Sequence, residues 1–281
     1  MTTAERAYLD REFSPSRLVP DIGHYLREYS ARSAEARAAF AHRTLRYGTA
    51  APELLDFFPV PGAAAAPLMV FVHGGFWQES GREQAAFTAS GFLERGVAYA
   101  ALGYGLAPAH RLDGIVAMVR RAVRLLARTA PVLGVDPARI HLAGSSAGAH
   151  LAAMALGDPH VAGVSLLSGI YDLEPMTGSY VNEALGLTRA EARRLSPLGR
   201  LPRGLPPIVL ARGEHETGEF IRQHNAMSAA LTAAGGDVTD LVIAGRTHFD
   251  VPYDLPDPTT PLGAAVARQL AAGRTVPAAR E

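Results

Sequence analysis

From residue 53 onward, short apolar segments alternate with longer amphipathic stretches along the chain. We expect seven strands, in ELLDFFPV, APLMVFVHG, VAYAALGYGL, RIHLAGSS, VAGVSLLSG, PPIVLARGE and VTDLVIAG. We expect helices between them at 82–95, 111–130, 147–157, 219–234 and 261–272. Continuous apolar strands that alternate with helices predict an α/β fold with a mainly parallel central sheet covered by helices on both faces.

The first 50 residues have a different pattern. They are rich in Arg, Glu and Ala, and the stretch Tyr25–Phe40 has helical spacing. We therefore predict a helical N-terminal extension, 1–50, that packs on a main domain formed by 51–281. The pattern leaves two roles open for this extension, a lid over the mouth of the active site or the contact surface of a homodimer.

Composition limits the kind of chemistry. The chain has no Cys, which excludes disulfides, thiol nucleophiles and Cys-ligated metals. Its 27 basic residues balance 27 acidic ones, so we expect no electrostatic binding to nucleic acid or to an anionic membrane. The N-terminus has no apolar signal region, and the apolar stretches are far shorter than the ~20 residues that span a bilayer. We expect a cytoplasmic, soluble protein whose partner is a small molecule.

A candidate nucleophile lies in the sequence Gly144-Ser145-Ser146-Ala147-Gly148, which follows the strand RIHLA and precedes the helical stretch AHLAAMAL. In a parallel sheet, functional residues gather where the strands end. The G-x-S-x-G spacing places its central Ser on a tight, strained turn, and the flanking Gly residues relieve crowding between strand and helix. We therefore predict Ser146 as the nucleophile.

A second motif, HGGFW at 73–77, follows the strand APLMVFV. Two glycines after a strand allow backbone N–H groups to point into a cavity, where a negatively charged oxygen in a transition state needs such donors. For a nucleophile on a strand–turn–helix, the N–H of the next residue, here Ala147, supplies a further donor.

The base and the orienting acid should follow in the order Ser, acid, His. Of the ten histidines, His248 follows the last predicted strand, LVIAG, near the C-terminus. The preceding strand, PPIVLARG, is followed by Glu214, Glu216 and Glu219, of which Glu219 begins a helix and suits its dipole. The acid would hold the imidazole in one tautomer and stabilise the imidazolium. We favour Glu216, at the tip of the loop, and Glu214 stays open.

These motifs together resemble the α/β-hydrolase fold, and more closely the kynurenine formamidase (arylformamidase) family. The similarity covers about 13–270. It is carried by HGGFW, GSSAGAHL (144–151), LSGIYDLEP (167–175), NEALGL (182–187), LSP (195–197), GEHETGEFIRQ (213–223) and SPSRLVPD (14–21). The H-G-G-x-W form differs from the H-G-G-G of related esterases. Two departures are Ser145, where family members often have His, and Glu, where some members have Asp as the acid.

The resemblance implies a serine hydrolase with Ser146 as nucleophile, Glu216 as acid and His248 as base. The expected reaction is cleavage of the formyl amide of an N-formyl arylamine, such as N-formylkynurenine, through an acyl-enzyme that releases formate and the free amine. This mechanism needs no metal and no organic cofactor.

By the same resemblance, the backbone N–H groups of Gly75 and Phe76 form the oxyanion hole together with that of Ala147. Aromatic side chains near the motifs are candidates for stacking on an aromatic substrate, and one amide is a polar candidate. These substrate-binding candidates are Trp77, Tyr104, Tyr171, Phe249 and Asn182.

Two other readings stay open. The same triad suits a carboxylic-ester hydrolase or acyltransferase that acts on a small acyl group. A hydrolase-fold binding protein without activity is the other alternative, although the chain retains Ser146, His248 and nearby acids. The residues also leave open whether the pathway is tryptophan breakdown or the synthesis of a specialised metabolite.

Overall fold

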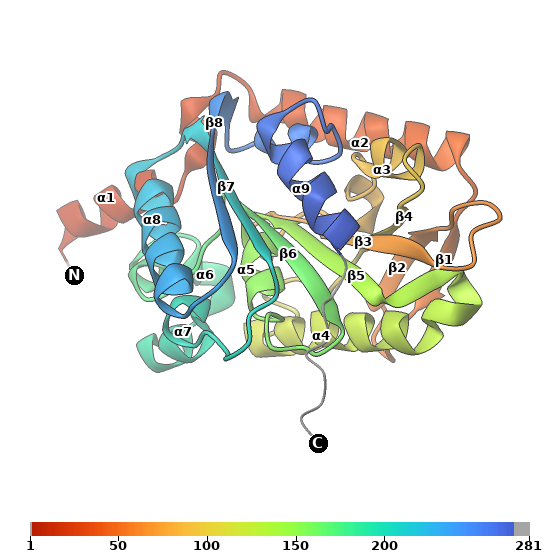
Figure 1. Ribbon diagram of the computed structural model, residues 1–281. Coiled ribbons are helices and arrows are strands. Elements are labelled where there is room, and N and C mark those ends of the chain that lie inside the picture. Colours follow the sequence, from red (N-terminus) through yellow and green to blue (C-terminus); the bar gives the residue numbers. More distant parts are fainter. Residues whose placement is uncertain (1, 273–281) are drawn as a thin grey trace.

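The computed structural model describes residues 2–272 (Figure 1). The strands are β1 (Arg43–Arg46), β2 (Leu54–Phe58), β3 (Ala66–Val72), β4 (Ala98–Leu102), β5 (Val135–Ser145), β6 (Val161–Leu167), β7 (Ile208–His215) and β8 (Val238–Thr247). The helices are α1 (Thr3–Glu12), α2 (Ile22–Ala39), α3 (Ala89–Leu93), α4 (Leu112–Thr129), α5 (Ala147–Ala153), α6 (Asn182–Leu185), α7 (Arg189–Leu195), α8 (Gly218–Ala233) and α9 (Pro261–Ala272). The last part of the expected main domain, 273–281, lies outside the described residues, as does the first residue of the expected extension.

One sheet contains all eight described strands, in the order β1-β2-β4-β3-β5-β6-β7-β8. β2 runs antiparallel to β1 and β4, and the pairs from β4 to β8 are parallel. The register aligns Val72 with Gly144, and Gly144 with Leu166. The ends of β3, β5 and β6 therefore lie side by side, which brings the loops that follow them to one edge of the sheet. The predicted α/β-hydrolase architecture is confirmed.

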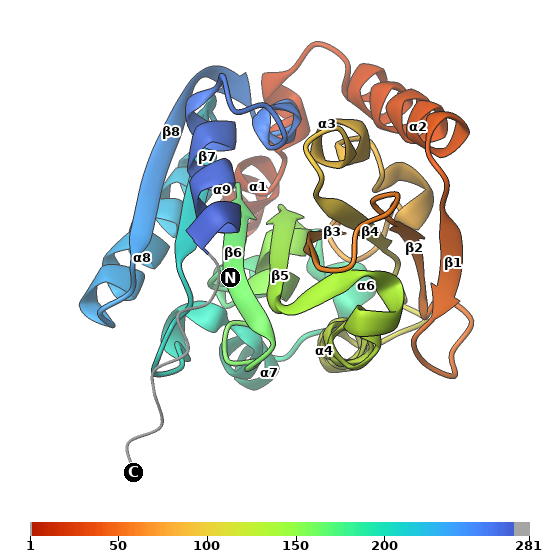
Figure 2. The same ribbon diagram turned by 45° about the vertical axis from the view of Figure 1, so that its right-hand side comes forward.

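Helices cover both faces of the sheet because the strands are buried on both sides and each covering helix has an apolar stripe. In α4, buried side chains recur every three or four residues, at Leu112, Val116, Val119, Val123 and Leu126. One core lies between the sheet and α4, α5 and α8, and a second core lies between the sheet and α2, α3 and α9 (Figures 1 and 2). Within the described residues, no helix is long and apolar enough to cross a membrane.

The structure differs from the sequence-based expectation at two places near the edge of the sheet. The eighth strand, β1, was not predicted because RTLR has only one half-buried side chain and no apolar run. The stretch 82–95 was predicted as one helix, but it contains a short 3-10 turn at Arg82–Gln84 and then α3. The Arg37 guanidinium binds the carbonyl oxygens of Arg82 and Glu83, which a continuous helix would use internally.

The N-terminal segment packs directly on the rest of the chain, and it is helical up to α2. Phe13 is fully buried against Phe220 of α8, and the Thr217 hydroxyl donates to the Glu12 carbonyl at 2.6 Å. Beyond α2, Arg43–Arg46 join the sheet as β1, so the segment is continuous with the domain at that edge. In both views α2 lies beside α3 (Figures 1 and 2).

Candidate active site

Ser146 occupies a strained turn between β5 and α5. Its backbone has φ +57° and ψ −120°, a conformation that residues with a side chain rarely adopt. The turn is held by the Ser146 N–H, which donates to the Leu167 carbonyl at 2.8 Å. It is also held by the Ser146 carbonyl, which accepts from Ala149 and His150 at 3.0 and 3.2 Å. Surrounding hydrogen bonds therefore impose a geometry that presents the Ser146 side chain at the end of the sheet.

The two glycines of the motif have no room for a side chain. A Cβ on Gly144 would lie 2.2 Å from the Gly148 carbonyl oxygen, and a Cβ on Gly148 would lie 2.0 Å from that of Val72. Both separations are well below van der Waals contact. Gly144 and Gly148 are thus required by the close approach of β3, β5 and α5, as the G-x-S-x-G pattern indicates.

His248 follows β8 and pairs with Glu216, which follows β7. The Nδ1 atom of His248 lies 2.9 Å from Oε2 of Glu216, and the carboxylate side chain is 0% exposed. An ionised carboxylate only accepts hydrogen bonds, so this pairing favours the tautomer with the proton on Nδ1 and with Nε2 as the acceptor. Glu214 is exposed and instead accepts the Gly245 N–H at 2.8 Å. Glu219 binds Arg222.

The loop after β3 lies directly against the nucleophile. A Cβ on Gly74 would lie 3.2 Å from Cβ of Ser146. Gly75 and Phe76 have φ of +98° and +48°, and the Gly75 carbonyl is used by the N–H groups of Gln78 and Glu79. Within residues 2–272, no acceptor pairs with the backbone N–H of Gly75, Phe76 or Ala147. Gly75 and Phe76 line the same pocket as Ser146, and Ala147 directly follows Ser146 in the chain.

Ser146 and His248 line one pocket, with a volume of about 210 Å³. Six aromatic side chains contribute to its lining, and Glu79 is the one residue with a formal charge among those that line it. The aromatic lining residues are Tyr29, Phe71, Phe76, Phe87, Tyr180 and Phe249, and the N-terminal segment adds Pro15, Ser16, Ile22 and Leu26. Ser145, the position where family members often have His, also lines the pocket.

Trp77 and Tyr104 do not line this pocket, which corrects the expectation that they stack on a substrate. Trp77 is fully buried and packs edge-on against the His150 ring, with ring centroids 4.9 Å apart. Tyr104 is buried beneath the loop and its hydroxyl donates to the His73 carbonyl at 2.8 Å. Both side chains hold the loop after β3, residues 73–77, from inside the core. Of the predicted substrate contacts, Phe249 does line the pocket.

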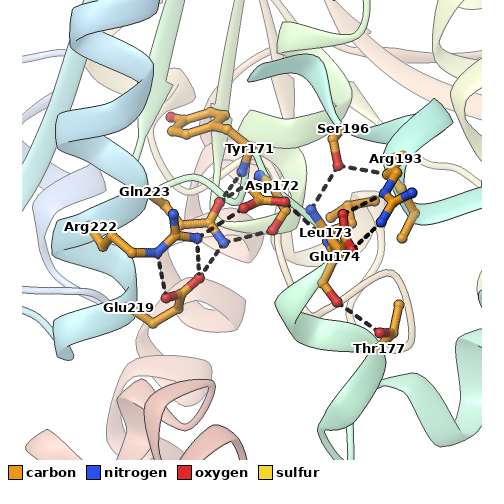
Figure 3. Close-up of polar contacts among 11 residues, drawn as sticks. Tyr171, Asp172, Leu173, Glu174, Thr177, Arg193, Ser196, Glu219, Arg222 and Gln223 are labelled. Carbon is orange, nitrogen blue, oxygen red and sulfur yellow. Dashed lines mark hydrogen bonds and ion pairs between the residues drawn. The ribbon is translucent and has the colours of Figure 1, made fainter. Parts of the chain in front are cut away.

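Tyr171 and Asn182 also lie away from the pocket. Tyr171 is buried in the loop after β6, where its N–H and that of Asp172 both donate to Oε1 of Gln223 on α8 (Figure 3). Asn182 is used locally, since its side chain exchanges two hydrogen bonds with the backbone of Leu187, at 2.8 and 3.0 Å. The backbone of Tyr171 and the side chain of Asn182 therefore hold the chain around them in place.

Five of the lining residues that the sequence did not identify come from the N-terminal segment. Ile22, Leu26 and Tyr29 follow one another at helical spacing, so they share a face of α2. That spacing is visible in the sequence, but it does not say which surface the face covers. Tyr180 and Phe87 were missed because the pattern gives no sign that their loops reach the site.

Burial lowers the pKa of His73, His141 and His150 to about 4 each, so these rings are neutral at pH 7. His73 also lines the pocket, and its Nδ1 donates to the Gly74 carbonyl at 2.9 Å. In the described part of the chain, no three His, Asp or Glu side chains are grouped as metal ligands would be.

Comparison with known proteins gives consistent matches. A family model described as BD-FAE matches residues 55–163. Kynurenine formamidase of Danio rerio is 32% identical over 271 residues, covering 89% of this chain and 91% of that protein. Kynurenine formamidase of Salmo salar is 33% identical over 272 residues, with the same coverage. A solved structure of a putative thioesterase from silicibacter sp. tm1040 superposes with TM-score 0.83 at 26% identity, covering 92% of this chain and 98% of that one.

Proposed function

Because the chain belongs to the kynurenine formamidase family of α/β-hydrolases, we propose that it hydrolyses the formyl amide of N-formyl arylamines such as N-formylkynurenine. Family membership and the esterase-like fold establish an amide or ester hydrolase. The observation that carries the finer proposal is the pocket itself, in which Ser146 and the Glu216-paired His248 lie together with six aromatic side chains. An aryl ring fits such a lining because offset and edge-on ring contacts are favourable.

The proposed reaction begins when Nε2 of His248 takes the proton of the Ser146 hydroxyl as its oxygen attacks the formyl carbon. The C=O π bond opens, and the negative oxygen is stabilised by the backbone N–H groups of Gly75, Phe76 and Ala147. His248 then gives its proton to the nitrogen as the C–N bond breaks, and the arylamine leaves. Water, deprotonated by His248, releases formate from the formyl-enzyme in the same way and regenerates Ser146. Glu216 keeps Nδ1 protonated throughout.

The small acyl group and the aromatic leaving group match different parts of the site. The loop after β3 lies against Ser146, because a Cβ on Gly74 would lie 3.2 Å from Cβ of Ser146. Little room is therefore left for the acyl group on this side of the nucleophile. Ile22, Leu26 and Tyr29 of α2 contribute another part of the lining. The lining holds one carboxylate, Glu79, and no Arg, which suits a leaving group that carries an ammonium.

The test compares N-formylkynurenine with a p-nitrophenyl ester of a small acid, using wild type and Ser146→Ala. We expect formate and arylamine release by wild type, and a fall in kcat of roughly 10⁴- to 10⁶-fold on loss of the nucleophile. Ser146→Ala activity near the wild-type level would refute the nucleophile. Ester cleavage without formamide cleavage would favour the second candidate, an ester hydrolase, which the likeness to a putative thioesterase supports.

A further inference from the structure

Helix α2 of the N-terminal segment reaches the loop that carries His248. The Tyr29 hydroxyl donates a hydrogen bond to the carbonyl oxygen of Phe249, the residue directly after the proposed base. One turn earlier, the Tyr25 ring packs on the Phe249 ring with centroids 5.6 Å apart. Two side chains of one helix thus contact the backbone and the side chain of the same residue.

Tyr29 is itself held in place by its neighbours. Its ring lies 4.4 Å from that of Phe87 and 5.6 Å from that of Tyr253, centroid to centroid. Arg32, one turn further along α2, stacks over the Tyr253 ring at 4.2 Å. Burial raises the pKa of Tyr29 well above that of a free tyrosine, so the hydroxyl keeps its proton and remains a donor. The group that reaches the loop is therefore fixed in position and in protonation state.

The far end of α2 is anchored independently of the pocket. Arg37 forms an ion pair with the buried Asp56 of β2 at 2.9 Å and donates to the Arg82 carbonyl at 2.6 Å. The pocket end is more open, because Ile22 and Leu26 line the pocket and are 37% and 38% exposed. Tyr29 lies between the anchored end and the open end, at the point where α2 meets the His248 loop.

β8 pairs with β7 as far as Thr247, opposite His215, so the sheet places the chain up to the residue before His248, and the hydrogen bonds of the loop beyond it are local. Thr247 N–H donates to Asp250 Oδ1 at 2.6 Å, and Phe249 N–H donates to Thr247 Oγ1 at 3.3 Å. These two local bonds shape the loop, and neither ties the main chain after His248 to another segment of the protein. Glu216 holds the imidazole at Nδ1, and the Tyr29 hydroxyl holds the main chain one residue on.

We propose that Tyr29 is a positioning residue for His248, so that α2 orients the base as well as forming one wall of the pocket. This inference rests on the proposed function, since it requires His248 to act on Ser146. Small displacements of a catalytic group cost rate because proton transfer requires close alignment. The expected loss on removing one neutral hydrogen bond is about 3- to 10-fold in kcat.

The experiment compares Tyr29→Phe, which keeps the ring and removes the hydroxyl, with Tyr25→Phe, which removes a hydroxyl from the adjacent ring that stacks on Phe249. Each variant is measured for kcat and KM with N-formylkynurenine and for melting temperature. Each is also measured for its second-order rate of labelling by a small dialkyl fluorophosphonate. That probe reports the reactivity of Ser146 with His248 and has no aryl group to bind α2.

For Tyr29→Phe we expect kcat and the labelling rate to fall together by about 3- to 10-fold with KM within about twofold, because only the alignment of the base changes. Tyr25→Phe should match wild type in both rates. An increase in KM alone, an unchanged labelling rate, or equal losses in the two variants would overturn the proposal. A wild-type enzyme that is not labelled would instead contradict the proposed function, so the two failures are distinguishable.

Discussion

Replacing Glu216 with Gln separates the charge of the proposed acid from its shape. Gln has nearly the same volume and can still face His248, but it carries no negative charge. The carboxylate lies 2.9 Å from Nδ1 and its side chain is 0% exposed, so water screens the pair little. Two unit charges about 4 Å apart at an effective dielectric constant of about 20 interact by about 4 kcal/mol. The imidazolium forms when His248 takes a proton during the reaction, in the tetrahedral intermediates and the transition states that flank them, so this energy acts on the barrier.

An energy of about 4 kcal/mol corresponds to a loss of about 10³-fold in kcat. The assay is formate release at saturating N-formylkynurenine, with urea denaturation to verify folding. Glu214→Gln is the matched control, since Glu214 is exposed and bonds the Gly245 N–H rather than His248. We expect this control to change kcat by less than about twofold. Glu216→Gln activity above about a tenth of wild type, or an equal loss in the control, would refute the reasoning.

Two further predictions concern stability. Gly148→Ala should destabilise the fold by about 3 kcal/mol or more, because its Cβ would lie 2.0 Å from the Val72 carbonyl oxygen. At Gly114 in α4, an added Cβ would have no neighbour within 4 Å, so Gly114→Ala should stabilise the fold by about 0.5–1 kcal/mol in the same urea titrations. Equal effects of the two substitutions would contradict the packing argument. Burial lowers the pKa of His141 and two other histidines to about 4. The unfolded chain therefore binds more protons between about pH 6.5 and 4, and stability should fall as pH falls through this window, by up to about 1.4 kcal/mol per pH unit per histidine. His141→Leu should flatten this dependence between pH 7 and 5, and an unchanged slope would refute it.

The catalytic motifs could be located from the sequence because each depends on local constraints. Gly144 and Gly148 mark a close approach that no other residue tolerates, and their spacing identifies Ser146 between them. The alternation of apolar and amphipathic segments predicts the order of seven strands and the helices between them, which the sheet contains. Position after a strand was then enough to select His248 and to limit the acid to a short loop.

The residues that line the pocket could not be located from the sequence in this way. Trp77 and Tyr171 are close to the motifs in sequence, yet the chain turns them into the core. Leu26 and Tyr29 are more than a hundred residues from Ser146, and they line the same pocket. Proximity along the chain is a poor guide for aromatic side chains, because burial favours the core over the surface of a cleft.

The amino-acid sequence by itself determines the architecture, the strained turn that carries Ser146 and the chemical class of this hydrolase. Periodicity, glycine spacing and residue order are local properties, and they act wherever the rest of the chain lies. Only the tertiary structure decides that Glu216 rather than Glu214 meets His248, and that α2 covers the pocket. Both outcomes depend on contacts between segments far apart in the chain, which packing selects and local pattern does not encode.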